Sequence, residues 1–307
     1  MKKILRLLMA VLIVSLIGLC ACGGPAQGHP PHGQGGQSGE EQPDPFEGIT
    51  LKILGIGNSY TLDTLQYFED IAKDLGVQTE IVTLTIGGCT LDMHYERAVG
   101  DIGEYEYRTN SGSEWTNFTK DYKLSDAIKQ EEWDYIMLQQ ASGSCGNAAT
   151  YSHLDDLLEI FRGWAWEGAQ FIWNMTWTYS KDSTNAEFYK YKYSQDFMYQ
   201  QIVGTQISLI YSRMGKDFSV FNPANTAIHN ARSSFLGDTL NSDGTHLTPL
   251  GRYIAGMALF KSITGKSVDD IKYIPSYEID ERMRLVAIES VNNAVANPFS
   301  VIQSKYL

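Results

Sequence analysis

The fold is decided by the stretch Leu51-Lys52-Ile53-Leu54-Gly55-Ile56-Gly57-Asn58-Ser59-Tyr60-Thr61. Its first six residues are almost all apolar and β-prone, which is typical of a strand buried in a sheet. A Gly-Asn-Ser turn follows, and apolar residues then recur every three or four positions as far as Gly76, which predicts a helix. A buried strand that leads directly into an amphipathic helix is the opening unit of a parallel α/β sheet.

The same alternation continues outward along the chain. Short apolar runs at residues 80–84, 135–138, 170–173 and 218–221 predict four more strands, and amphipathic stretches predict helices at 152–167, 186–214, 248–264 and 278–295. We therefore expect residues 49–307 to form one α/β domain, a three-layer flavodoxin-like fold with a parallel five-stranded sheet and helices on both faces. The aromatic, glycine-bearing segment near residues 95–125 reads as an insertion with a hairpin of its own.

The N-terminal segment has the features of an export signal. Three basic residues (Lys2, Lys3 and Arg6) precede an apolar run at 7–19 that is short for a membrane span, although a membrane anchor is the alternative. The run ends at Ala21-Cys22, which resembles a bacterial lipobox, so we expect cleavage after residue 21 and lipidation of Cys22. Residues 22–48, rich in Gly and Pro, would be a flexible tether. The sequence thus predicts an exported protein that a lipid alone attaches to the bacterial membrane, facing outside.

Composition excludes several classes of function. With 24 Lys and Arg against 36 Asp and Glu, the net charge is −12, so no nucleic-acid partner is expected. The chain has neither the spacing of a metal site nor a glycine-rich loop followed by Lys, so we expect no metal and no cofactor. Beyond the signal, two cysteines remain, Cys89 and Cys145; a disulfide or two buried thiols are both compatible with the sequence, and the oligomeric state stays open.

Candidate catalytic groups follow from the predicted strand ends, because ligands of open parallel sheets bind outside the carboxyl ends of the strands. Ser59 comes directly after the first strand. Far along the chain, Asp243 precedes His246 by three residues, a spacing that lets the carboxylate hold the Nδ1 hydrogen and turn Nε2 toward a nucleophile. The alternatives are that Ser59 merely caps a helix and that the Asp-x-x-His turn is an ordinary surface loop.

Taken together, these blocks resemble the SGNH (GDSL-like) hydrolase superfamily over residues 49–264, in an uncharacterised branch of exported bacterial proteins. The resemblance lies in Ile-Gly-Asn-Ser-Tyr-Thr, Gly-Gly-Cys-Thr-Leu, Trp-Asp-Tyr-Ile-Met-Leu-Gln-Gln and Asp-Gly-Thr-His-Leu. It implies Ser59 as nucleophile, His246 as base and Asp243 as the residue that orients it. It also implies an oxyanion hole formed by the N–H of Ser59, by Gly88 and by a side-chain amide.

The amide departs from the superfamily pattern, since Gln139-Gln140-Ala141-Ser142 replaces the usual Gly-x-Asn-Asp and is similar to the Gln-Gly-Glu-Ser of carbohydrate acetylesterases. We expect Gln140 to be this donor, with Gln139 or Asn147 as alternatives.

Three further residues near these blocks are expected to contact substrate. They are Asn58, His94 and Trp177; the alternative for His94 and Trp177 is a place in the core.

The resemblance implies an extracellular serine esterase that removes a small acyl group, O-acetyl above all, from carbohydrate. A lipid esterase or thioesterase with the same triad, or a catalytically silent carbohydrate-binding lipoprotein, are the alternatives.

Overall fold

The computed structural model describes residues 44–307, so the expected signal peptide, Cys22 and most of the 22–48 tether lie outside the described residues. Residues 44–47 form a turn in which the Glu47 N–H donates to the Asp44 carbonyl at 3.1 Å. Residues 49–307 form one compact unit. In the described part of the chain, no helix has the length and apolarity needed to cross a bilayer.

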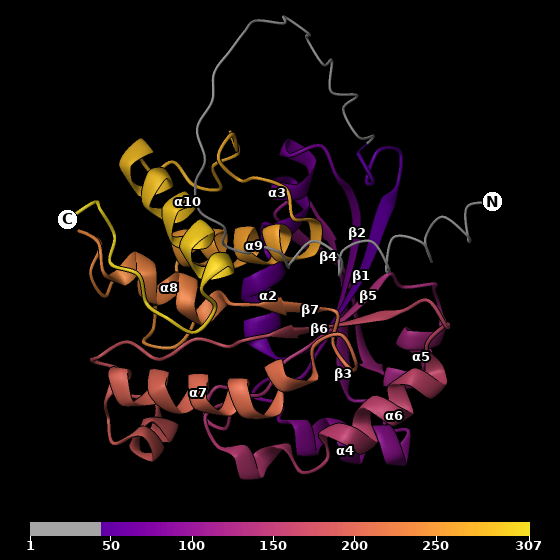
Figure 1. The fold of residues 1–307 in the computed structure, drawn as a ribbon. Coiled ribbons are helices and arrows are strands. Elements are labelled where there is room, and N and C mark those ends of the chain that lie inside the picture. The colour runs from indigo at the N-terminus through magenta and orange to yellow at the C-terminus, as the bar shows by residue number, and fades with distance from the viewer. Residues whose placement is uncertain (1–43) are drawn as a thin grey trace, which may run out of the picture. The chain divides into compact units, whose positions relative to one another are not determined.

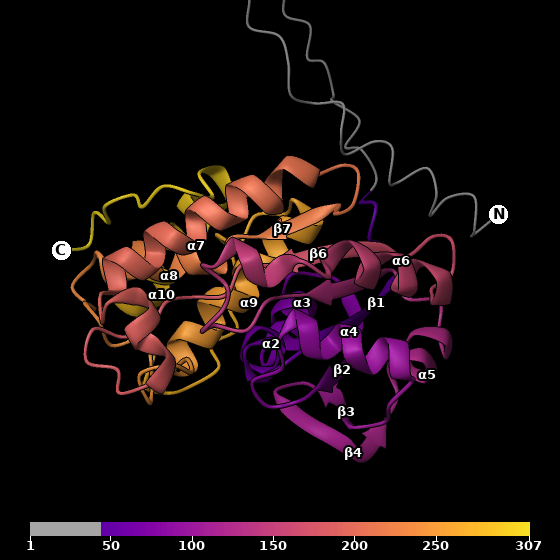
Figure 2. The same cartoon turned by 90° about the horizontal axis from the view of Figure 1, so that it is seen from below.

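A seven-stranded mixed sheet forms the middle layer of this unit, with the strand order β4-β3-β2-β1-β5-β6-β7. Figure 2 labels each of these strands except β5. Five of the strands are parallel, and each lies within two residues of a predicted strand. The parallel strands are β1 (Thr50–Gly57), β2 (Gln78–Thr85), β5 (Tyr135–Leu138), β6 (Gln170–Asn174) and β7 (Val220–Asn222).

The prediction of a five-stranded, wholly parallel sheet is wrong, because a hairpin adds two antiparallel strands at one edge. They are β3 (Tyr105–Ser111) and β4 (Glu114–Tyr122), which lie inside the expected insertion. β3 pairs with β2 so that Thr83 faces Arg108. β3 is mostly half-buried and β4 mostly exposed, and polar residues separate the aromatic ones in both, so these strands lack the apolar run that predicted the other strands.

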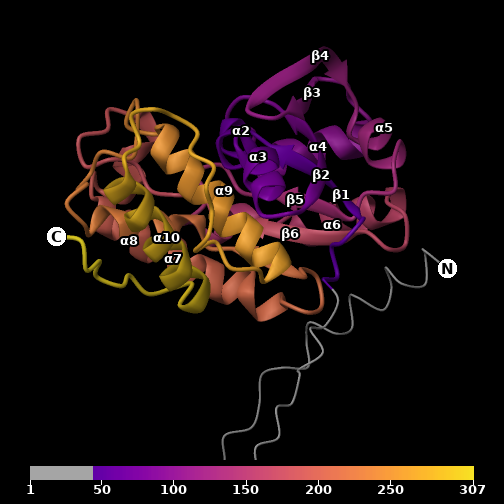
Figure 3. The same ribbon diagram turned by 90° about the horizontal axis from the view of Figure 1, so that it is seen from above.

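Helices cover both faces of the sheet (Figure 1). One face carries α4 (Leu91–Gly100), α5 (Leu124–Lys129), α6 (Leu154–Trp164) and α7 (Gln195–Leu209). The other carries α2 (Ser59–Leu65), α3 (Phe68–Asp74), α8 (Ala224–Arg232), α9 (Pro249–Thr264) and α10 (Glu281–Ala296); α9 and α10 lie in front in Figure 3. Short 3₁₀ helices are η1 (Ala148–Tyr151), η2 (Ala186–Tyr191) and η3 (Tyr211–Arg213). This is the three-layer α/β arrangement that the sequence predicted.

The central strand β1 is largely buried and tightly packed, and this packing constrains the turn that follows it. Ile53, Leu54 and Ile56 of β1 are fully buried because helices cover both faces. At Gly57 a Cβ atom would lie 2.2 Å from the Thr61 hydroxyl oxygen, so a larger residue fits only if the Thr61 side chain moves. The strand therefore turns abruptly into α2, which begins at Ser59.

Candidate active site

The structure brings Ser59 and His246 into contact across 187 positions of the chain. The Oγ atom of Ser59 lies 2.8 Å from Nε2 of His246, and Nδ1 of His246 lies 2.6 Å from Oδ2 of Asp243. Hydroxyl, imidazole and carboxylate thus form an unbroken hydrogen-bonded series, the geometry of a serine nucleophile with its base and orienting acid. The side chains of His246 and Asp243 are 36% and 54% exposed, so a substrate can reach them from solvent.

A closed loop presents His246 to Ser59. Asn241 and Leu247 form an antiparallel bridge, and Thr248 caps the N-terminus of α9 by accepting a hydrogen bond from the Gly251 N–H. Inside the loop, the other carboxylate oxygen of Asp243 accepts from the N–H of His246 at 2.7 Å. Partial burial alone would raise the pKa of Asp243, but hydrogen bonds from His246 and Thr245 hold it well below its usual range. Asp243 therefore stays ionised and can stabilise a positive charge on the imidazole.

Two backbone N–H groups are available to receive an oxyanion. Gly88 lies in the turn after β2 with a φ of +65°, a conformation that favours glycine, and open space surrounds it. Within residues 44–307, neither its N–H nor that of Ser59 donates to a protein acceptor. The side chain of Asn58 ties the two turns together, because its Nδ2 donates to the Cys89 carbonyl at 3.1 Å.

The expected amide donor, Gln140, is engaged elsewhere. Its Nε2 donates to the carbonyl and hydroxyl of Thr150, at 2.8 and 3.2 Å, and its Oε1 accepts from the N–H groups of Leu91 and Ala141. The expectation for Gln140 is therefore corrected: its buried amide fastens the loop after β5 to α4 and η1. The alternative Gln139 is also buried, with Nε2 donating to Asn58; Asn147, the third candidate, is exposed and caps η1.

The expected contact of Trp177 with substrate is also corrected, because this indole is fully buried. Its Nε1 donates to the Thr245 carbonyl at 2.9 Å, and its ring stacks on Tyr60 at a centroid distance of 4.3 Å. Tyr60 lies in turn 5.9 Å from the His246 ring. Trp177 thus supports the loop that carries His246, from the side that faces the core, and offers no face to a sugar.

Two other expected substrate contacts are buried. Asn58 caps α2, since its Oδ1 accepts from the Tyr60 N–H at 3.0 Å. His94 lies in α4 with Nδ1 2.6 Å from the Tyr105 hydroxyl, and burial, together with the nearby Arg97 charge, lowers its pKa to about 3. Neither side chain reaches solvent, so the expected substrate contact of each is replaced by a structural one.

Cys89 and Cys145, whose pairing the sequence left open, are both free and buried. Burial raises the pKa of Cys89 to about 12 and that of Cys145 to about 11, so both are neutral thiols at physiological pH.

Sequence analysis missed Asp63, which links the segments that carry Ser59 and His246. It lies one helical turn after Ser59 in α2, and its Oδ2 accepts from the N–H of Leu247, the residue after His246, at 2.8 Å. Its Oδ1 pairs with Nε of Arg252 in α9 at 2.8 Å. Burial raises the pKa of Asp63, while Arg252 opposes this shift. The sequence offered one indication of this role: Asp63 is a carboxylate between Leu62 and Leu65, in a predicted helix whose apolar residues face the core.

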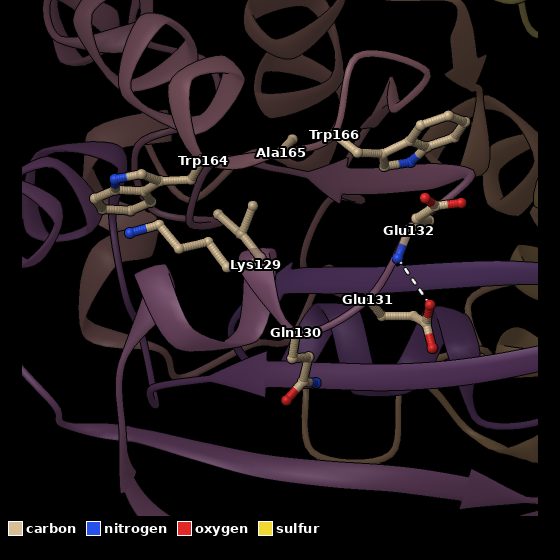
Figure 4. Close-up of a pocket in the computed structure, with 8 residues that line it drawn as sticks. Lys129, Gln130, Glu131, Glu132, Trp164, Ala165 and Trp166 are labelled. Carbon is tan, nitrogen blue, oxygen red and sulfur yellow. Dashed lines mark hydrogen bonds between the residues drawn. The ribbon is translucent and has the colours of Figure 1, made fainter.

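A surface hollow of about 320 Å³ lies away from this site, at the opposite ends of the strands (Figure 4). Its lining comes from the segments that lead into β5 and follow α6, including Lys129, Glu132, Trp164 and Trp166. Lys129 already lies over the Trp164 ring, and the Trp166 indole donates to the Trp133 carbonyl. Across residues 44–307, no three His, Cys, Asp or Glu side chains lie together as a metal site would require.

Comparison with known proteins places the chain in a family. A family model described as a domain of unknown function (DUF4886) matches residues 52–294. The crystal structure of a DUF4886 family protein from Bacteroides uniformis is 31% identical, has a TM-score of 0.78, and is covered over 98% of its length by 83% of this chain. No curated protein matches the chain.

Other similar solved structures, at lower identity, are those of lipases and esterases. A candidate GDSL-like lipase from Parabacteroides merdae is 14% identical with a TM-score of 0.45, over 70% of this chain and 95% of that one. A catalytic mutant of an acetylxylan esterase from Geobacillus stearothermophilus is 12% identical with a TM-score of 0.39, over 69% and 94%.

Proposed function

The chain belongs to the DUF4886 family, and from the geometry of its candidate site we propose that it is a serine esterase that removes small acyl groups, acetyl above all, from carbohydrates. The single observation that carries the proposal is the hydrogen-bonded series from Ser59 through His246 to Asp243. A serine hydroxyl is a weak nucleophile unless a base takes its proton, and here the base lies within hydrogen-bonding distance and is itself oriented.

In the first half of the proposed reaction, Oγ of Ser59 attacks the ester carbonyl carbon while Nε2 of His246 takes the hydroxyl proton. Asp243, ionised at neutral pH, stabilises the imidazolium. The carbonyl oxygen becomes an oxyanion, which accepts hydrogen bonds from the N–H groups of Ser59 and Gly88. When the intermediate collapses, the bond to the leaving alcohol breaks and His246 returns the proton to that alcohol oxygen.

In the second half, water takes the place of the alcohol. His246 accepts a proton from the water as its oxygen attacks the acyl-enzyme, and the same two N–H groups stabilise the second oxyanion. Collapse then breaks the bond to Ser59 Oγ, the proton returns to that oxygen, and the carboxylic acid leaves. No group beyond this chain's own residues and water is required for the cycle to balance.

A hydrated substrate agrees with the surroundings of the site. The segment after β6 contacts the catalytic loop, because the Ser180 N–H donates to the Gly244 carbonyl at 3.0 Å. Farther along it, Tyr189 and Tyr193 are 58% and 68% exposed, and such rings can lie against sugar faces. We further propose that lipidation of Cys22 holds the protein on the outer side of the bacterial membrane; mature membrane-bound protein whose Cys22 carries no lipid by mass spectrometry would contradict this.

The test compares hydrolysis of 4-nitrophenyl acetate by the wild type and by Ser59→Ala, with Ser208→Ala as the matched control. Ser208 lies exposed on α7, where its hydroxyl donates to a helical carbonyl, so its loss should leave activity unchanged. Loss of Ser59 should reduce turnover by at least a thousandfold. Undiminished hydrolysis by Ser59→Ala would overturn the proposal.

Two measurements separate the alternatives. Activity on 4-nitrophenyl esters of increasing acyl length should fall beyond acetyl and propionyl, whereas a lipid esterase would become faster. A fluorophosphonate probe should label Ser59, because only an activated serine reacts; an unlabelled protein would favour the catalytically silent binder. Release of acetate from acetylated polysaccharides then identifies the sugar.

A further inference from the structure

Four buried side-chain amides form a continuous hydrogen-bonded chain beneath the candidate active site. Nδ2 of Asn222 donates to Oδ1 of Asn174 at 2.8 Å, and Nδ2 of Asn174 donates to Oε1 of Gln139 at 2.9 Å. Nε2 of Gln139 then donates to Oδ1 of Asn58 at 2.7 Å, and Nδ2 of Asn58 donates to the Cys89 carbonyl. Asn222 ends β7 and Asn174 ends β6, while Gln139 follows β5 and Asn58 follows β1. The hydrogen-bonded amides therefore cross the carboxyl edge of the parallel sheet from strand to strand.

Backbone groups at the catalytic end fix the direction of this amide chain. Oδ1 of Asn58 accepts from the Tyr60 N–H, which can only donate, and Nδ2 of Asn58 faces the Cys89 carbonyl, which can only accept. Asn58 therefore has one allowed orientation. Each following amide must then present its oxygen to the next N–H₂ group, so the orientation of Gln139, and that of Asn174 behind it, follows from that of Asn58.

No water competes for these bonds, because each of the four side chains is at most 2% exposed. Hydrogen bonds in such an interior are stronger than in water, and successive bonds polarise one another. A second bond from Asn174 to the Thr64 hydroxyl, at 3.1 Å, also anchors the amide chain to α2. The amide chain is therefore a rigid support beneath the turns that follow β1 and β2.

We propose that this amide chain is a positioning device for the oxyanion hole: it sets the distance and angle between the N–H groups of Ser59 and Gly88. Its last member, Asn58, directly precedes Ser59, and the carbonyl it holds belongs to Cys89, directly after Gly88. Neither N–H has another protein partner among residues 44–307 that could fix its direction. None of the four amides needs to touch substrate, so each acts through Asn58. The inference rests on the proposed esterase function.

The test cuts the amide chain at two places and reads kcat and KM separately. Gln139→Met preserves length but breaks the bonds to Asn58 and Asn174, and misplacing one oxyanion donor should lower kcat by about tenfold to a hundredfold. KM should stay within about twofold, because ground-state binding does not use the oxyanion geometry. Asn222→Leu removes only the remote first link and should lower kcat by about threefold, which also provides a reading if Gln139→Met does not fold.

Asn230→Leu is the matched control, since Asn230 is equally buried but bonds to the Ser290 carbonyl and the Ile302 N–H, outside the amide chain. It should lose stability and keep its kcat. As a second readout, a phenylboronic acid, whose tetrahedral adduct places an oxygen in the oxyanion hole, should bind Gln139→Met more weakly by the same factor as kcat falls.

Folded Gln139→Met and Asn222→Leu with kcat within twofold of the wild type would overturn the inference, as would an equal loss in Asn230→Leu. These results leave the proposed function standing, because the wild type remains active. A wild type that neither hydrolyses acetyl esters nor reacts with fluorophosphonate would overturn both.

Discussion

Replacing Asp63 with Leu should separate His246, the proposed base, from Ser59, the proposed nucleophile, without changing either residue. Asp63 holds the N–H next to His246 and lies one helical turn from Ser59, so one carboxylate connects the two segments. Leucine is close to aspartate in size and removes both the hydrogen-bond acceptor and the charge. The loop that carries His246 would then be held only from other sides, by Trp177, by the Ser180 N–H, by Arg232 and by its own closing bonds.

The loss of stability expected for Asp63→Leu follows from the exposure of the two partners of this ion pair. Removing one partner of a buried ion pair costs about 3–5 kcal/mol. The side chain of Asp63 is 6% exposed but that of Arg252 is 30% exposed, so solvent screening reduces this to about 2–3 kcal/mol, including the lost bond to Leu247. A displacement of His246 by about 1 Å should lower kcat by about a hundredfold.

The assay is urea unfolding, followed by kcat on 4-nitrophenyl acetate corrected for the folded fraction. Asp63→Asn is the matched control: it keeps an oxygen for the Leu247 N–H but loses the charge that pairs with Arg252. We expect Asp63→Asn to lose stability while its kcat stays within about threefold of the wild type. A folded Asp63→Leu variant that turns over as fast as the wild type would contradict this role of Asp63, and so would an Asp63→Asn variant that is as slow as Asp63→Leu.

Two further predictions concern buried titratable groups. Burial raises the pKa of Cys89 to about 12 and that of Cys145 to about 11, so neither thiol should react with a thiol reagent at pH 8 in the folded protein. Both should react in urea, measured in a variant with Cys20 and Cys22 replaced by Ala. Thiols that stay unreactive in urea would reveal a disulfide. Because the pKa of His94 falls from an ordinary 6.5 to about 3, the unfolded chain binds a proton in this window that the native chain does not, so stability should drop by about 4 kcal/mol as the pH falls from 7 to 3. His94→Gln should flatten this pH dependence in thermal melts, and an unchanged slope would contradict the assignment.

The parallel strands could be predicted from the sequence because strands buried on both faces consist of consecutive apolar residues. β1 and β5 are covered on both faces, and such strands need no alternation to be recognised. The hairpin of β3 and β4 could be suspected but not placed. Most of its residues are polar and are half-buried in β3 or exposed in β4, and pairing with β2 depends on backbone hydrogen bonds, which do not require a particular side-chain type.

The meeting of Ser59 with His246 could be anticipated because both lie at the carboxyl ends of parallel strands or in loops that return there, and topology brings such loops together. The role of an amide or an indole could not be derived in this way. Gln140 and Trp177 follow the expected strands, yet each points into the interior, and only the positions of Thr150 and Thr245 decide what they bond. A side chain with both donors and acceptors fits a substrate site and a structural tie equally well.

The reacting groups and their supports lie in two layers with opposite demands. In the proposed mechanism, His246 and Asp243 must reach solvent so that substrate, alcohol and acid can exchange, and exposure leaves their own hydrogen bonds open to competition from water. The positions of Ser59 and His246 must therefore be fixed by the buried residues beneath them, which are Asp63, Trp177 and the amide chain. This arrangement explains why polar residues occur at the carboxyl ends of otherwise apolar strands. Substitutions in the buried layer should accordingly change turnover more than substrate affinity.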